Sequence, residues 1–117
     1  MTITVSNLIP AKFVENVQTT QYTVDAPNDS RTVVTLDNFT LTNISSSDVV
    51  FSCNLVLSGE SPSNSNKVLS GRVIAPGETY LCPELVGKVL REGSYISTIA
   101  GTANALVMSV SGRIINT

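Results

Sequence analysis

The side chains that could do chemistry in this 117-residue chain are few, and histidine is absent. Without histidine the chain lacks the usual general base near neutral pH and the commonest metal ligand. The Ser-His and Cys-His arrangements that activate a nucleophile are therefore excluded. No alternating segment brings two carboxylates to one face, as a glycosidase would require. Nearly all of the nine acids fall in or beside segments of loop composition. The nine are Glu15, Asp25, Asp29, Asp37, Asp48, Glu60, Glu78, Glu84 and Glu92.

The two cysteines, Cys53 and Cys82, lie far apart in the sequence. Two soft ligands without histidine do not make a structural zinc site. Asn64 and Asn66 lack the following acid that a calcium loop requires. We therefore expect no metal, no cofactor and no enzymatic activity. Assembly in a cytoplasm favours two free, buried thiols, although the sequence does not exclude a disulfide between them.

Three tyrosines, Tyr22, Tyr80 and Tyr95, could form a platform that stacks against a sugar. Separate tyrosines at the ends of expected strands are more often half-buried core residues. The chain has no tryptophan, which has the largest stacking face, and this counts against sugar binding. Carbohydrate recognition is kept as the less favoured alternative.

The elements that must position these groups are strands, because β-branched residues dominate the composition. The chain has 15 Val, 8 Ile and 13 Thr, which fit a pleated strand and are stiff in a helix. Its length suits one domain with one core. We expect a single β-sandwich domain over residues 13–117, preceded by an N-terminal arm over residues 1–12.

The charge and hydropathy patterns exclude two classes of partner. The net charge is −2 and no Lys or Arg cluster occurs, so nucleic-acid binding is not expected. No apolar run approaches the ~20 residues of a membrane span, so we expect no membrane partner. The first residues carry no signal-peptide pattern, which favours assembly in a cytoplasm.

Alternation of apolar and polar residues predicts most of the strands. Two strands show it best, with shared faces made by Val49, Phe51, Cys53, Leu55 and Leu57, and by Leu106, Met108, Val110, Gly112 and Ile114. Further strands are expected over residues 32–43, 67–74, 79–82 and 95–99. Turns are expected at 26–30 and 75–78, and a polar loop without a packing anchor at 59–66. The pattern predicts an antiparallel β-sandwich, either jelly-roll or immunoglobulin-like.

Two segments depart from this strand pattern. Residues 83–91 are the one segment typical of a short helix, because Pro83 suits a first helical position and Gly93 suits the residue beyond its end. The arm over residues 1–12 is apolar without a clear helical period, so it must dock on its own domain or on another subunit. Its candidate assembly-contact residues are Ile3, Val5, Leu8, Ile9 and Pro10.

Several motifs together resemble small virion proteins encoded by tailed bacteriophages. They are LTNIS (41–45), VVF (49–51), VIAPGETY (73–80), PELVG (83–87), LREGSYI (90–96) and ALVMSVSGR (105–113). The resemblance covers about residues 36–115. It implies a structural role with many copies in a virion, assembled in the host cytoplasm, and it transfers no individual binding residue.

Two hypotheses of function follow. The first is a capsid decoration (cement) protein that stabilises the phage head, as a homo-oligomer with a trimer favoured, bound to the major capsid protein or other virion proteins; a neck or tail component is its close alternative. The second is a receptor- or carbohydrate-binding module. A neutral surface rich in Ser, Thr and Asn suits protein contact, and we favour the first hypothesis.

Overall fold

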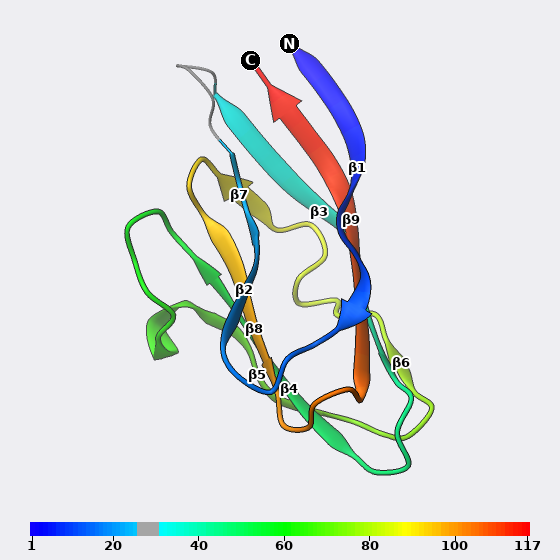
Figure 1. The fold of residues 1–117 in the computed structure, drawn as a ribbon. Coiled ribbons are helices and arrows are strands. Elements are labelled where there is room, and N and C mark those ends of the chain that lie inside the picture. Colours follow the sequence, from blue (N-terminus) through cyan, green and yellow to red (C-terminus); the bar gives the residue numbers. More distant parts are fainter. Residues whose placement is uncertain (26–30) are drawn as a thin grey trace.

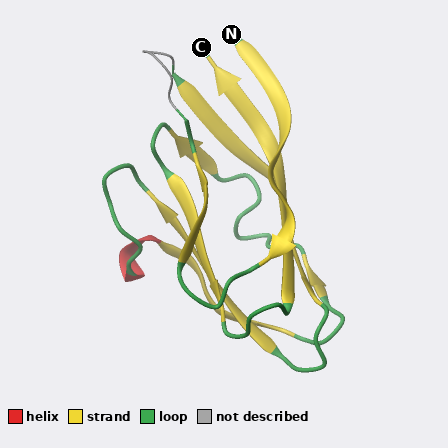
Figure 2. Ribbon diagram, in the orientation of Figure 1, coloured by secondary structure: helices red, strands yellow, loops and turns green. Residues whose placement is uncertain are grey.

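The computed structural model describes residues 1–25 and 31–117, which form two antiparallel sheets packed face to face (Figures 1 and 2). The turn expected at residues 26–30 lies outside this described part. The first sheet contains, in order, β1 (Thr2–Phe13), β9 (Leu106–Asn116) and β3 (Thr32–Asn43), with β6 (Thr79–Tyr80) and β7 (Val89–Arg91) both on the far edge of β3. The second sheet contains β2 (Thr19–Thr23), β8 (Tyr95–Ala100), β4 (Val49–Val56) and β5 (Lys67–Ile74).

The pairing of the strands is nested along the chain. β1 pairs with β9, β2 with β8, β3 with β6 and β7, and β4 with β5. A hairpin-like ribbon of four such pairs, rolled so that successive pairs alternate between two sheets, is the jelly-roll arrangement. The predicted all-β sandwich is therefore confirmed, and of the two expected topologies the strand order is that of a jelly roll.

The core lies between the sheets and comes from the alternating residues of the central strands. Phe39 of β3 lies opposite Val110 of β9, and both are buried. Phe39 also meets Phe51 of β4 across the sandwich, with ring centroids 6.3 Å apart and planes tilted by 60°, an arrangement that aromatic pairs favour. The inward faces predicted for β4 and β9 are confirmed in part: Leu55 and Ile114 are half-buried, and Leu57 lies beyond the end of β4 and is exposed. Val56, on the opposite face of β4, is buried as well.

Gly112 of β9 allows the first sheet to close. A Cβ atom at this position would collide with the carbonyl oxygen of Thr35 on β3 and would crowd Leu8 of β1. Any larger residue would therefore push apart strands on both sides of β9. The close approach explains why glycine interrupts the apolar face of this strand.

Residues 1–12 do not form the expected irregular arm. They belong to β1, which pairs with β9 along its length and is an integral edge strand of the first sheet. Two register shifts, between Ser6 and Ile9 and between Ile9 and Lys12, add residues to β1. These bulges break the two-residue alternation, which explains why the segment does not look like a strand in the sequence.

The helix expected over residues 83–91 is absent. The chain makes turns through residues 83–87 and then enters β7, which pairs with β3. Gly87 adopts φ +87, which ends the turn, and its N–H donates to the carbonyl of Leu36 at 2.7 Å. Of the pairs that a helix would place on one face, Leu85 with Val89 and Val86 with Leu90, each has one buried leucine and one exposed valine. Pairing with β3 therefore overrides a weak helical preference.

The polar loop at residues 59–66 has an anchor, contrary to the expectation. Asn54 is buried on β4, and its side-chain amide donates to the carbonyl of Ser63 at 2.8 Å and to Oδ1 of Asn66 at 2.7 Å. The loop ends in a short 3-10 turn at Asn64–Asn66. The hydroxyl of Tyr95 donates to the carbonyl of Glu60 at 2.8 Å, so the loop is held at two points.

At the end that carries both termini, β1 and β9 run on past β8 and the rest of the second sheet (Figure 1). We call the paired segments at this end the terminal extension: residues 2–6 of β1, 112–116 of β9 and 32–36 of β3. In β3 of this extension, Val34 and Leu36 are still buried in the core. Residues 2–5 of β1 are all exposed. Within the described residues, no helix is long and apolar enough to cross a membrane.

Candidate functional site

The five predicted contact residues divide into two groups. Ile3 and Val5 are exposed in the terminal extension, by 54% and 79%. Leu8 and Ile9 are buried in the core of the sandwich, and Pro10 is exposed beyond them. Only Ile3 and Val5, together with Pro10, are therefore available to a partner. For Leu8 and Ile9 the structure gives a packing role instead.

Strand register places further apolar residues beside Ile3 and Val5. One row across the sheet runs from Ile3 on β1 to Ile115 on β9 and Val33 on β3. The next row runs from Val5 on β1 to Arg113 on β9, Thr35 on β3 and Val89 on β7. The intervening residues, such as Val34 and Leu90, are buried toward the core, so these rows lie on the outer face. We call the apolar members the outer patch: Ile3, Val5, Val33, Val89 and Ile115. Sequence analysis missed the last three, because their proximity depends on pairing between distant strands.

The main chain of β1 presents polar groups at the edge of the first sheet. Thr117 exchanges both of its main-chain hydrogen bonds with Arg31, at 3.0 and 3.4 Å, so it faces toward β3. The main-chain N–H and C=O groups of successive residues in β9 point to opposite neighbouring strands. Those of Ile114 therefore point toward β1, where Ile114 pairs with Thr4. By the same alternation, the N–H and C=O groups of Ile3 and Val5 point away from β9, to the open edge.

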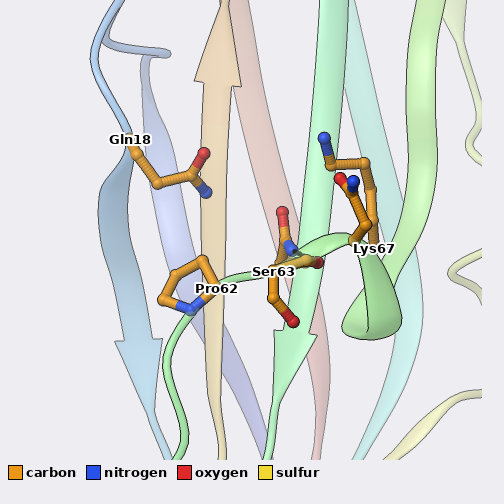
Figure 3. A pocket seen from close by; sticks show the side chains of 6 residues that line it. Gln18, Pro62, Ser63 and Lys67 are labelled. Carbon is orange, nitrogen blue, oxygen red and sulfur yellow. Dashed lines mark hydrogen bonds between the residues drawn. The ribbon is translucent and has the colours of Figure 1, made fainter.

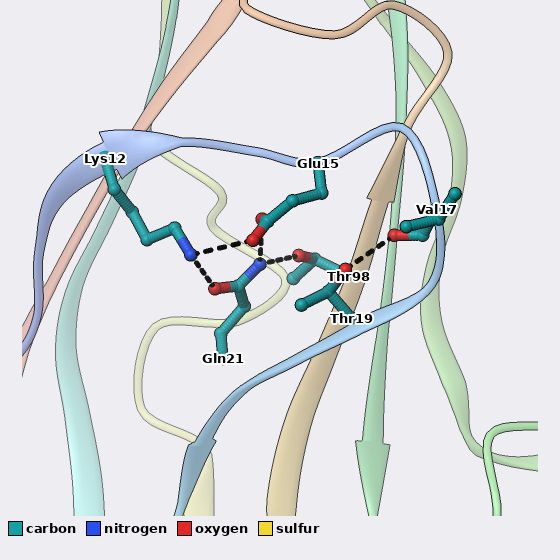
Figure 4. Close-up of polar contacts among 6 residues, drawn as sticks. All are labelled: Lys12, Glu15, Val17, Thr19, Gln21 and Thr98. Carbon is teal, nitrogen blue, oxygen red and sulfur yellow. Dashed lines mark hydrogen bonds and ion pairs between the residues drawn. The ribbon is translucent and has the colours of Figure 1, made fainter.

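The other half of β1 is held by a polar cluster where the chain crosses to the second sheet (Figure 4). Lys12 Nζ donates to Glu15 at 3.0 Å and to Gln21 at 2.8 Å, and the Gln21 amide donates to Glu15 at 2.8 Å and to Thr98 at 3.0 Å. The hydrogen bond from Gln21, with that from Lys12, lowers the pKa of Glu15. The cluster joins β1, β2 and β8, so its role is structural.

A small polar pocket lies between the chain before β2 and the anchored loop (Figure 3). Its volume is about 190 Å³, and its lining is Gln18, Asn54, Pro62, Ser63, Asn64 and Lys67. The Asn54 amide is already bound to the loop, and Gln18 donates to Ser97 at 2.7 Å. Among the described residues, every buried side-chain nitrogen or oxygen has a hydrogen-bond partner. No buried polar group of the pocket is therefore left unpaired in the described part of the chain, while Lys67 lines it as an exposed side chain.

A larger, apolar-lined pocket of about 330 Å³ opens beside β3, between the part of β3 that pairs with β7 and the part that pairs with β6. It is bounded by residues 37–40 of β3 and by Leu81, Pro83 and Val86 of the connecting segment. Leu81 and Val86 are exposed by 64% and 43%. The pocket is shallow compared with sites that enclose a small molecule.

The tyrosines do not form one platform. Tyr22 packs against the core from β2, opposite Ile96 of β8. Tyr95 is the first residue of β8, and its hydroxyl bonds to the loop at Glu60. Tyr80 lies on the other sheet, where its hydroxyl donates to the Glu84 carboxylate at 2.6 and 2.7 Å and its ring lies 4.3 Å from the Arg72 guanidinium carbon. Burial and Glu84 raise the pKa of Tyr80 to about 12.

The two thiols are free and buried, as predicted. Burial, with the nearby Glu84 charge, raises the pKa of Cys82 to about 12, and burial raises the pKa of Cys53 as well. Both thiols are therefore protonated near neutral pH and unsuited to nucleophilic attack. In residues 1–25 and 31–117, no group of three or more His, Cys, Asp or Glu side chains is placed to hold a metal ion.

Comparison with known proteins found no matching family model, no matching curated protein and no matching solved structure. The candidate functional site therefore stands on geometry alone, and it is the open edge of β1 with the outer patch.

Proposed function

We propose that this protein is a non-enzymatic structural protein of a tailed-phage virion, a decoration (cement) protein that stabilises the head. The observation that carries this proposal is the terminal extension. There, exposed Ile3 and Val5 adjoin an open strand edge whose main-chain groups have no partner on that side among residues 1–25 and 31–117. Apolar surface and edge groups of this kind are typical of protein contacts made by strand addition.

The fold and the earlier resemblance support the same proposal. Jelly rolls are found in viral capsid domains, as well as in lectins and cupins. This analogy is at the level of the fold and carries less weight than a site. Two of the resembling motifs, at residues 90–96 and 105–113, lie largely in β7 and β9 of the first sheet and in β8 of the second.

The partner in this proposal is the major capsid protein or another virion protein, met in the host cytoplasm during assembly. An extended segment of the partner would add to the first sheet by main-chain hydrogen bonds, while its apolar side chains cover the outer patch. Each contact can be weak, because many copies on a symmetric shell act together. A trimer around a local symmetry axis remains the expected oligomer for this role.

The decisive test is the copy number of this protein in purified particles of the phage that encodes it, by quantitative mass spectrometry. A decoration protein is expected at hundreds of copies per particle, as the symmetry of a head requires. A number near six or twelve, typical of a ring, would instead assign it to the neck or tail. Absence from particles would overturn the virion role altogether.

A second test asks which surface binds the head. Particles lacking the protein are incubated with the wild-type chain or with Val5→Lys, and bound protein is measured after sedimentation. We expect Val5→Lys to bind at least about tenfold more weakly, because the charge must be desolvated in the contact. Val73→Lys, a change at an exposed valine of β5, is the matched control. Deletion of residues 1–12 is unsuitable, since it would remove Leu8 and Ile9 from the core.

The receptor-binding alternative makes a different prediction. The isolated domain would bind cells or glycans saturably, and the binding would be lost on changing Tyr22, Tyr80 or Tyr95. The placement of these tyrosines on two sheets and two faces gives that alternative no shared stacking surface. We therefore retain the structural role.

A further inference from the structure

Residues 2–6 form the least protected strand edge in the described sheets. Edge strands are usually shielded by charges, proline, bulges or short length. β6 and β7 have two and three residues, and β2 has five residues and a register shift. β5 has two register shifts and begins with Lys67. The second half of β1 has bulges, Pro10 and Lys12. Residues 2–6 are Thr, Ile, Thr, Val and Ser, with none of these devices.

The same five residues are complementary to themselves when two copies run antiparallel. With Thr4 at the centre, Ile3 of one copy lies opposite Val5 of the other, and Thr2 lies opposite Ser6. Apolar β-branched residues then pair with each other, and hydroxyl residues pair with each other, and both combinations stabilise cross-strand contacts. A shift of this register by one residue would place Ile3 or Val5 against a threonine.

The direction of the main-chain groups is compatible with this register and excludes a shift by one residue. Ile3 and Val5 present their N–H and C=O groups to the open edge, whereas Thr4 bonds to β9. In an antiparallel pair, opposed residues that both face the partner exchange two hydrogen bonds. Ile3 opposite Val5 satisfies this rule twice, once on each side of Thr4. The two copies of Thr4 then form the close, non-hydrogen-bonded pair between them.

Charge also permits the pairing. Residues 1–11 contain no charged side chain, so no like charges face each other across the seam. The nearest charge on the neighbouring strand is Arg113, opposite Val5, and its guanidinium is paired with Asp37 at 3.1 Å. Two-fold symmetry would bring the outer patches of both copies onto one face, with Ile3 and Val5 of each copy at the centre.

We infer that two copies of this chain associate through residues 2–6 of β1, antiparallel about a two-fold axis at Thr4, to form one continuous sheet across both molecules. This pair is isologous and closes on itself, so it departs from the trimer expected of a decoration protein. It is a property of the free chain; a partner strand of the kind in the proposed function would use the same edge of β1, so binding to a particle would have to displace the second copy. The prediction of the particle copy number and the prediction of the dimer can therefore fail separately.

The first experiment measures association by sedimentation velocity over a range of concentrations. The wild-type chain should be a dimer that dissociates on dilution. Val5→Pro removes an N–H that faces the open edge and spares the bonds to β9, and it should raise the dissociation constant at least about tenfold. Val73→Lys, on the exposed part of β5, should leave the dimer unchanged.

The second experiment tests the register with charge. The double variant I3K/V5K places lysine opposite lysine at both positions and should be monomeric. I3K/V5E carries equally polar side chains but places lysine opposite glutamate, and it should regain the dimer, most strongly at low ionic strength. Both double variants alter exposed residues, so circular dichroism should show an unchanged fold. If Val5→Pro fails to fold, this pair decides the question.

The third experiment uses cross-linking. The two copies of Thr4 are expected about 4.5 Å apart between Cα atoms, within the range for a disulfide. Oxidised Thr4→Cys should therefore form a covalent dimer on a non-reducing gel. The matched variant Thr2→Cys should not, because its two cysteines would lie more than about 12 Å apart. The native thiols are buried and do not compete.

Three outcomes would overturn the inference. The first is a wild-type chain that stays monomeric at high concentration. The second is a trimer, or a dimer that Val5→Pro leaves intact. The third is equal cross-linking of Thr4→Cys and Thr2→Cys. A chain that is monomeric alone but binds particles through Val5 would contradict self-pairing while supporting the proposed function.

Discussion

The two halves of β1 are neighbours in one strand, yet they do opposite things. Residues 8 and 9 are buried, one bulge lies on each side of Ile9, and Pro10 and the cluster around Lys12 follow. Residues 2–6 run flat along β9 with Ile3 and Val5 exposed. The comparison teaches that apolar content does not distinguish a core segment from a contact segment. What separates them is whether the second sheet covers the strand.

Gly112 lies at the boundary between the two halves and should give the largest effect. Gly112→Ala places a Cβ against the Thr35 carbonyl oxygen and the Leu8 side chain. Strand separation should lower the free energy of unfolding by at least about 3 kcal/mol. The measurement is chemical denaturation. Gly101→Ala is the control, because its Cβ would meet Val50 atoms at 3.7–3.8 Å, an ordinary contact. Equal losses in both variants would remove the special role of Gly112.

Truncation of one apolar residue in each half compares them directly. Ile9→Ala should cost about 2–5 kcal/mol of stability, because it empties a buried site. Val5→Ala should change the stability of the monomer by less than about 0.5 kcal/mol, since Val5 is 79% exposed, while it weakens association. Denaturation at low protein concentration separates the two effects. Similar costs at both positions would mean that the terminal extension is packed in the free chain.

Sequence patterns predict the elements that are covered on one face and exposed on the other. The strand expected over residues 32–43 appears as Thr32–Asn43, and the inward faces of β4 and β9 follow the two-residue alternation. The first half of the chain departs from this only where bulges interrupt the period, as in β1. Alternation is visible in a sequence only as long as the register is unbroken.

The errors have physical causes. Residues 83–91 carry the local signals of a short helix, but residues 89–91 pair with β3 instead. A pairing with a distant strand leaves no local signal in the sequence. The same is true of the functional site. Ile3 and Val5 could be chosen from the sequence because they are apolar and near no predicted core. Val33, Val89 and Ile115 could not, because only the register of three strands brings them to one face.

Amide hydrogen exchange should show which side of β1 is bonded. In the monomeric I3K/V5K variant, the amide of Thr4 donates to β9 and should exchange about tenfold or more slowly than those at positions 3 and 5. In the second half, the Val14 amide donates to the Leu106 carbonyl at 2.9 Å and should be better protected still. The measurement is exchange followed by NMR. Equal exchange at positions 3, 4 and 5 would show that the terminal extension frays from β9.

Acid should loosen the second half of β1 by a small amount and leave the first half unaffected. The hydrogen bond from Gln21, and then that from Lys12, lower the pKa of Glu15 below its ordinary 4.5. A lowered pKa in the folded state stabilises the fold above the ordinary value, and this stabilisation is lost as the pH falls through the folded value. Because the Lys12 and Glu15 side chains are 39% and 38% exposed, the effect should stay below about 1 kcal/mol.

The free energies of unfolding of wild type and Glu15→Gln, measured in urea, should therefore differ less at about pH 3 than at about pH 6. If Glu15→Gln loses stability equally at both pH values, the carboxylate charge is not what holds the crossing from β1 to β2.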